Sequence, residues 1–218
     1  MSFVEFQNVS YINDDKEILN NISLTIDQGD FISIVGPSGS GKSTLLKLCS
    51  HLISPTQGAI SFKGKDFNDY DPLALRKSIS YCFQTPYLFG DTVMENIHFP
   101  FSIRNIKPDS SKVRELFSLF QMEEDYLNRN VKTLSGGEKQ RIALIRSLLF
   151  KPEILLLDEI TSALDVDNTI LVENMITLLN KEGITVLWIT HNIDQSRKIA
   201  NKVLSIEAGK IKSLEELK

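Results

Sequence analysis

The sequence predicts an α/β protein whose core is a mostly parallel sheet. Short apolar or β-branched runs occur at 31–35, 154–157 and 185–189, and segments with helical spacing separate them. Strands that alternate with helices along a chain favour parallel pairing. The run at 154–157 contains no polar residue, as expected of a strand that is covered on both faces. These observations together predict the fold class.

Antiparallel ribbons are expected near both ends of the sequence. Apolar-rich runs at 3–9 and 18–26 flank a polar turn at 13–16. Near the other end, a run at 203–206 leads into a turn at 208–210. We therefore expect an N-terminal antiparallel ribbon and a shorter closing ribbon.

A strand, a loop and a helix are expected in that order after the first ribbon. The run at 31–35 stops at Gly36, a loop rich in glycine and serine follows, and 44–48 has helical spacing. Two more strands are expected at 58–65 and 77–83. The second of them ends directly before a glutamine.

The segment 85–150 has helical character. Thr92 with Glu95 and Ser135 with Glu138 fit the capping box, in which a hydroxyl residue precedes an acid by three positions at a helix start. An apolar stripe at helical spacing is formed by Val113, Leu116, Phe117 and Phe120. We expect 85–150 to be a helical subdomain inserted into the sheet.

The strand pattern returns after Pro152, and a helix is expected around 170–179. The sequence therefore predicts one domain over 1–218, with 1–84 and 151–218 forming the core and 85–150 forming the inserted subdomain. No internal repeat is evident.

Composition excludes several classes of protein. The 218 residues carry 24 Lys+Arg and 28 Asp+Glu, and 42% are apolar. The longest apolar runs have four residues, whereas a membrane-spanning helix needs ~20, and the first residues do not resemble a signal peptide. The net charge of −4 disfavours a general nucleic-acid binder. We expect the two cysteines, Cys49 and Cys82, to be buried in a protein of the reducing cytoplasm.

The loop after the run at 31–35 carries the strongest chemical signal. It fits the phosphate-binding pattern GxxxxGK[ST], because it reads Gly36, Pro37, Ser38, Gly39, Ser40, Gly41, Lys42 and Ser43, followed by Thr44. Its glycines allow backbone N–H groups to surround an anion at a helix start. Lys42 would reach the β- and γ-phosphates, and the Ser43 hydroxyl would bind Mg²⁺. A Gly-rich structural turn is the alternative.

Two adjacent carboxylates follow the apolar run at 154–157. Asp158 and Glu159 are delivered to the carboxyl end of a strand, which is the edge where open α/β sheets bind ligands. Asp158 is suited to hold Mg²⁺ through water. Glu159 would face the other way and could act as a general base toward water. A solvated acidic turn is the alternative.

Gln84 and His191 also follow predicted strands and are expected at the same edge. Gln84 could contact Mg²⁺ or the attacking water. His191 could donate to the γ-phosphate or orient that water. Neither residue identifies a site by itself, and a histidine at such a position is more often a surface or capping residue. Their shared placement at one edge is what supports a site.

A second anion-binding helix start is expected at 134–141, which reads LSGGEKQR. The chain then has two anion-binding helix starts but one nucleotide-binding loop. This suggests that the helix start at 134–141 binds a nucleotide held by a partner chain. Two copies related by two-fold symmetry would then complete each other's sites.

These motifs resemble the ATP-binding cassette (ABC) family over nearly the whole chain. LSGGEKQR is similar to the family's signature motif, and the order of the motifs matches as well. The resemblance implies a P-loop NTPase that binds ATP between two domains, with Ser135, Gly136 and Gly137 belonging to the signature. Ser135 and Gly137 would close on the γ-phosphate held by the other chain, and Asp165 would lie in the loop that links the two sites. Tyr11 occupies the place of the aromatic that stacks on adenine, although it could be an ordinary strand aromatic.

The segment 82–101 resembles a bacterial subfamily of iron-export ATP-binding subunits. Phe99, Phe101 and Ile103 could line a groove for a membrane partner, or they could be core residues of the helical part. No chemistry in the sequence identifies iron.

The resemblance implies an ATPase, with ATP and Mg²⁺ as cofactors, that drives a separate integral membrane permease. It would work as a homodimer or with a paralogue, cytoplasmic and peripheral on the inner face of the cell membrane, without nucleic acid. A soluble ABC ATPase acting on the ribosome or nucleic acid is the alternative, and a P-loop kinase is a more remote one.

Overall fold

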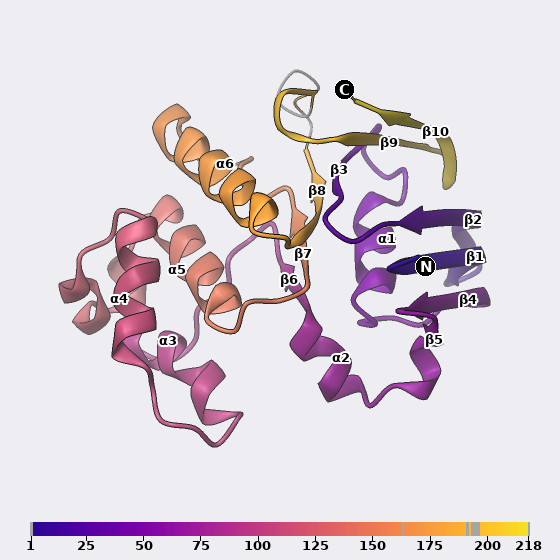
Figure 1. The fold of residues 1–218 in the computed structure, drawn as a ribbon. Coiled ribbons are helices and arrows are strands. Elements are labelled where there is room, and N and C mark those ends of the chain that lie inside the picture. Colours follow the sequence, from indigo (N-terminus) through magenta and orange to yellow (C-terminus); the bar gives the residue numbers. More distant parts are fainter. Residues whose placement is uncertain (1, 163, 191, 193–196, 218) are drawn as a thin grey trace.

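The computed structural model describes residues 2–162, 164–190, 192 and 197–217. These residues form two sheets with helices beside them (Figure 1).

The smaller sheet is antiparallel and has the strand order β2-β1-β4-β5. Its strands are β1 (Val4–Asn13), β2 (Lys16–Ile26), β4 (Gln57–Phe62) and β5 (Lys65–Asp66). Val4 pairs with Ile26 on one side and with Phe62 on the other, so β1 lies between its two partners. The predicted N-terminal ribbon is confirmed. The single strand expected at 58–65 is wrong at its end, because a turn at residues 63 and 64 divides it into β4 and β5, which pair with each other.

The larger sheet has the order β10-β9-β3-β8-β7-β6. Its strands are β3 (Phe31–Val35), β6 (Ile79–Cys82), β7 (Ile154–Asp158), β8 (Thr185–Ile189), β9 (Lys202–Glu207) and β10 (Lys210–Glu216). Every neighbouring pair is parallel except β9 with β10. All residues of β7 and β8 are buried, as the apolar runs predict. The mostly parallel α/β fold is confirmed, and the carboxyl ends of β3, β6, β7 and β8 share one edge.

Six α-helices and three short 3₁₀ turns lie wholly within the described part of the chain. The α-helices are α1 (Lys42–Cys49), α2 (Pro72–Ser78), α3 (Val93–Ser102), α4 (Ser110–Leu119), α5 (Gly136–Leu148) and α6 (Val166–Lys181). The 3₁₀ turns are η1 (Phe67–Asp69), η2 (Glu124–Asn128) and η3 (Val131–Thr133).

The strand expected at 77–83 is wrong at its start, because residues 77 and 78 are the last turn of α2. Local chemistry favours that helix. The Asp71 carboxylate accepts hydrogen bonds from the Leu73 and Ala74 N–H groups, and Pro72 stands in the first turn.

Each face of the larger sheet packs against a different layer. Leu155 and Leu157 of β7 belong to a core shared with α3, α4, α5 and α6. Leu156 lies on the opposite face, in a core shared with α1 and the antiparallel sheet. Figure 1 shows these two layers on opposite sides of the large sheet. Alternating residues of one strand therefore serve two cores.

Two of the helices within 85–150, α3 and α5, begin where the sequence indicates. Thr92 with Glu95 and Ser135 with Glu138 form complete capping boxes at α3 and α5. The predicted apolar stripe of α4 is buried. Both cysteines are free and buried. The division into a core and an inserted subdomain at 85–150 stays a prediction.

A search of the described helices finds none that is long and apolar enough to cross a membrane.

Candidate functional site

The loop between β3 and α1 leaves a set of backbone N–H groups unused. Gly36, Gly39 and Gly41 all have positive φ, and Gly41 precedes α1 without any side-chain cap. The N–H groups of Lys42 and Ser43 donate to no residue that the structure describes. Unpaired N–H groups at a helix start carry partial positive charge. The loop therefore has the properties of an anion site.

The Lys42 side chain is folded into this loop and is only 4% exposed. Its Nζ donates to the carbonyl oxygens of Gly36 at 3.0 Å and Pro37 at 2.9 Å. The ammonium group is thus held at the loop by neutral acceptors. A phosphate oxygen would be a stronger, charge-assisted acceptor at the same place.

Asp158 ends β7 beside this loop and is 7% exposed. Its Oδ1 accepts a hydrogen bond from the Ser43 hydroxyl at 2.9 Å, and its Oδ2 accepts one from the Tyr81 hydroxyl at 2.6 Å. Burial, and then the hydrogen bond to Asp158, raise the pKa of the Tyr81 phenol above its usual value. Tyr81 therefore remains a proton donor at neutral pH.

Glu159 turns away from Asp158 because its backbone adopts a φ of 51°, in the left-handed region. Gln84, which lies just beyond β6, donates from Nε2 to Glu159 Oε2 at 2.8 Å. The fold thus brings Gln84 and Glu159 together, and it gives the two adjacent carboxylates different partners.

The start of α5 is ordered by its own side chains. The Ser135 hydroxyl accepts from the Glu138 N–H at 3.2 Å, and Glu138 Oε2 accepts from the Ser135 N–H at 2.7 Å. The Tyr126 hydroxyl donates to Glu138 Oε1 at 2.7 Å and is the main cause that lowers the pKa of that carboxyl. Gly136 is exposed, and a Cβ added there would meet no atom within 4 Å.

Asp165 caps α6 and is connected to α5. Its Oδ1 accepts from the Asn168 N–H at 2.8 Å, and this bond is the main cause that lowers the pKa of Asp165. Arg141 of α5 donates from Nη1 to Asn168 Oδ1 at 2.6 Å. The loop before α6 is therefore coupled to α5 through two polar side chains.

Comparison with known proteins identifies the family. The model of a family described as ABC transporter matches residues 19–162, which is well over half of the chain. The chain belongs to the ABC transporter family. It is an ATP-binding subunit that hydrolyses ATP, and the transporter function is favoured over an action on the ribosome or nucleic acid.

Two curated relatives show the extent of the similarity. The chain is 48% identical over 205 residues to the probable iron export ATP-binding protein FetA of Escherichia coli, covering 94% of this chain and 91% of the relative. It is 37% identical over 200 residues to ABC transporter I family member 17 of Arabidopsis thaliana, covering 91% and 76%.

Solved structures give the same result. The ATP-binding cassette MJ0796, solved as a dimer in a post-hydrolysis state bound to ADP and Pi, superposes with a TM-score of 0.86 at 30% identity. The match covers 99% of both chains. A bacterial Atm1-family ABC exporter with ATP bound has a TM-score of 0.88 at 28% identity, over 98% of this chain and 38% of the exporter chain.

The structure of this ABC subunit joins some predicted site residues and leaves others apart. Ser43 contacts Asp158, and Gln84 contacts Glu159. Tyr11 lies in β1, paired with Leu19 of β2. Within the described ranges, no hydrogen bond or ion pair joins 135–137 to the loop at 36–43. The predicted catalytic His191 lies outside the described residues.

Sequence reasoning missed three residues of this ABC site: Tyr81, Arg141 and Asn168. Tyr81 pairs with Leu156 and so shares a face with Asp158 two positions on. The parity of the two strands could have suggested that contact, but only after β6 and β7 were known to be neighbours. Arg141 lies in the segment 134–141, so the sequence could have indicated this residue, but it could not indicate its hydrogen-bond partner Asn168.

The phosphate loop offers a matched pair of substitutions. An alanine Cβ at Gly41 (φ 102°) would lie 2.6 Å from Leu19 Cδ2 and 2.9 Å from the Ile18 oxygen, whereas at Gly39 (φ 76°) it would meet nothing within 4 Å. Both substitutions strain a left-handed backbone by about 1–2 kcal/mol. Gly41→Ala should therefore lower the urea midpoint of unfolding clearly more than Gly39→Ala does. Equal shifts for the two variants would contradict the predicted clash.

Proposed function

We propose that this chain is the ATP-hydrolysing subunit of an iron-export transporter, and that it works in pairs beneath a separate membrane permease. Iron as the cargo is supported by the 48% identity to the probable iron export ATP-binding protein of Escherichia coli, which extends over 91% of that relative. Such a subunit would be cytoplasmic and peripheral on the inner face of the cell membrane.

In this proposal the loop at 36–43 and Thr44 bind the phosphates of ATP. The unused N–H groups at the start of α1 and the Lys42 ammonium would face the phosphate oxygens. Tyr11 would stack on the adenine.

The residues around Asp158 fit a magnesium ion. Mg²⁺ prefers oxygen ligands and usually keeps several waters. The Ser43 hydroxyl and Asp158 Oδ1 are 2.9 Å apart, so they form a paired oxygen set at the end of the phosphate loop. Ser43, Asp158 and Gln84 would hold the ion, which would neutralise phosphate charge when bound.

We assign Glu159 as the general base that takes a proton from the attacking water. Its contact with Gln84 places it at the carboxyl edge of the sheet beside Asp158. His191 would orient the same water or donate to the γ-phosphate.

Removal of the Glu159 carboxylate tests this role. Glu159→Gln should lower ATP turnover by about 10²- to 10⁴-fold, because an amide cannot accept the proton. Phosphate release measures the rate, and size-exclusion chromatography with ATP should show a longer-lived dimer. The exposed Glu123→Gln is the matched control and should behave as the unaltered chain does. Unchanged turnover in Glu159→Gln would refute the assignment.

The dimer would be a homodimer or a pair with a paralogue. Ser135, Gly136 and Gly137 of one copy would close on the γ-phosphate held by the other. Asp165 would lie in the loop that links the two sites. The dimeric structure of the related cassette supports this arrangement.

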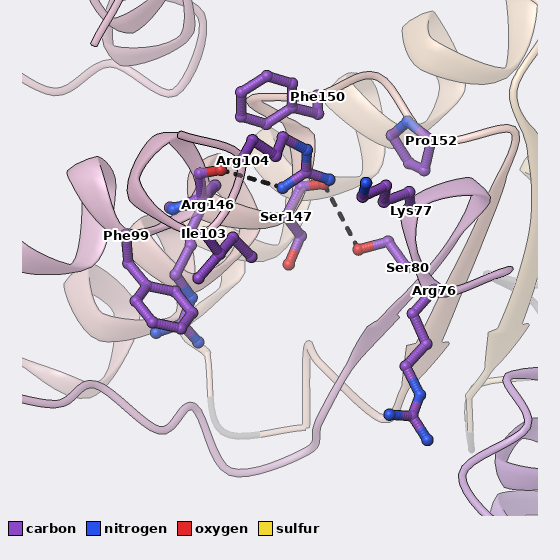
Figure 2. A pocket seen from close by; sticks show the side chains of 11 residues that line it. Arg76, Lys77, Ser80, Phe99, Ile103, Arg104, Arg146, Ser147, Phe150 and Pro152 are labelled. Carbon is purple, nitrogen blue, oxygen red and sulfur yellow. Dashed lines mark hydrogen bonds between the residues drawn. The ribbon is translucent and has the colours of Figure 1, made fainter. Parts of the chain in front are cut away.

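A pocket of about 190 Å³ between the helical part and the larger sheet suits a membrane partner (Figure 2). Phe99, Phe101 and Ile103 were each expected either to line a groove or to belong to the core. Phe101 is 1% exposed and belongs to the core, whereas Phe99 and Ile103 are 43% and 58% exposed and line the pocket. Apolar side chains thus remain uncovered at its mouth.

Four cations also line this pocket: Arg76, Lys77, Arg104 and Arg146. None of them forms an ion pair with a carboxylate of the described residues. Arg104 lies 4.0 Å from the Phe150 ring centre and donates to the Pro100 oxygen, and burial lowers its pKa. We propose that the occupant is a segment of the permease with apolar side chains and a carboxylate.

A charge placed at the pocket mouth tests the docking. Ile103→Asp should reduce recovery of the chain with membrane vesicles of the source cells in a flotation assay, because apolar contact is replaced by a charge. Ile106→Asp is the control, since Ile106 is also exposed but does not line the pocket. Equal losses for both variants, or equal recovery of the unaltered chain on protein-free lipid vesicles, would contradict docking to a permease here.

The cargo is tested in cells that lack this gene. After loading with iron, cells that express the unaltered chain should contain less iron than cells that express Glu159→Gln, because export requires turnover. Elemental analysis by mass spectrometry measures iron together with zinc and manganese. A change in another metal with unchanged iron would reject iron as the cargo and leave the ATPase assignment standing.

A further inference from the structure

The two carboxylate oxygens of Asp158 have different kinds of partner. Oδ1 faces the Ser43 hydroxyl, which belongs to the proposed metal site. Oδ2 accepts from the Tyr81 hydroxyl at 2.6 Å, which is a short hydrogen bond of the kind expected for O–H to a carboxylate. Tyr81 has no place in the phosphate loop or in the signature segment.

Tyr81 is held in this position by the sheet. It lies on β6, in register with Leu156 of β7, so its side chain and that of Asp158 project from the same face. Its ring packs against Phe83 with a centroid distance of 4.6 Å. Because Asp158 is 7% exposed, little water is available to replace the phenol if it is removed.

A carboxylate oxygen that accepts a short hydrogen bond has one lone pair fewer to offer and is held in its orientation, so it is a poorer cation ligand than the other oxygen. Mg²⁺ demands a near-octahedral shell and usually takes one oxygen of a carboxylate, directly or through water. Ca²⁺ is larger and accepts carboxylates with both oxygens. Oδ1 faces Ser43 at the proposed metal site, so the availability of Oδ2 to a cation bears on which cation the site prefers.

We propose that Tyr81 is a positioning residue that restricts Asp158 to one-oxygen contact and thereby favours Mg²⁺ over Ca²⁺ at the nucleotide site. This inference rests on the metal site of the proposed function. Without the phenol, Oδ2 is free to turn toward the cation, which suits Ca²⁺ better than Mg²⁺.

Nucleotide binding with different cations tests the proposal without relying on turnover. A fluorescent, non-hydrolysable ATP analogue is titrated against the full chain and Tyr81→Phe in EDTA, in Mg²⁺ and in Ca²⁺. In Tyr81→Phe the Mg²⁺ concentration for half-maximal binding should rise about tenfold, as expected for loss of one hydrogen bond to a charged group. The Ca²⁺ concentration should stay the same or fall, and affinity in EDTA should not change.

Tyr70→Phe is the matched control. It also removes a tyrosine hydroxyl from a hydrogen bond, the one to the Phe62 oxygen at 2.8 Å, in the region of the antiparallel sheet. It should leave the ratio of the Mg²⁺ and Ca²⁺ concentrations unchanged. Thermal unfolding without nucleotide reports any general loss of stability in either variant.

A purely structural role for Tyr81 predicts a different pattern. It would weaken binding equally with Mg²⁺, Ca²⁺ and EDTA, and that result, or an unchanged Mg²⁺ requirement, would overturn the proposal. Asp158→Asn separates this failure from failure of the metal site itself. If Asp158→Asn retains the full Mg²⁺ effect, the proposed metal site is wrong. If it loses that effect while Tyr81→Phe matches the unaltered chain, only the role of Tyr81 is wrong.

Discussion

The parallel pairing of β3, β6, β7 and β8 is the constraint on which the rest of the structure depends. Parallel strands end at the same edge, so chemistry that is distant in sequence is collected in one place. The phosphate loop follows β3, Gln84 follows β6, and the two acids end β7. The pairing is stable because both faces of these strands are buried against separate apolar layers. A site of this kind needs no residue to be carried on a long flexible loop.

The electrostatics at that edge follow from the same geometry. The side chains of β7 alternate between the two faces of the sheet, and the side chain of Asp158 lies on the face that packs against α1. There it accepts hydrogen bonds from the hydroxyl groups of Ser43 in α1 and Tyr81 in β6. A buried carboxylate without such donors would be costly. Glu159 leaves the alternation through its left-handed backbone and meets the amide of Gln84 instead. Two neighbouring acids thus receive environments that suit different roles, one toward a cation and one toward water.

Local signals in the sequence predicted most of the fold and the motifs, because their determinants lie within a few residues. The phosphate loop, both capping boxes and the fully buried strand β7 belong to this group. The contact of Tyr81 with Asp158 could not be predicted in that way, since it depends on which strands are neighbours and on their register. The split between Phe99 and Phe101 was equally hidden. Helical spacing places these two residues, which are two positions apart, on different faces of α3. Only the packing of α3 on α5 decides which of those faces is covered.

The signature segment explains why one copy of this ABC subunit would be incomplete. Glu138 uses both carboxylate oxygens within its own chain, on the Ser135 N–H and the Tyr126 hydroxyl, so the helix start is rigid before any ligand arrives. No hydrogen bond of the described residues uses the Gly136 or Gly137 N–H groups. Rigid, unpaired donors at a helix start suit an anion, yet no hydrogen bond joins them to the chain's own described phosphate loop. In the proposed dimer a second copy would supply the nucleotide to these donors. The hydrogen bonds from Arg141 to Asn168 and from Asn168 to Asp165 would then connect the two sites.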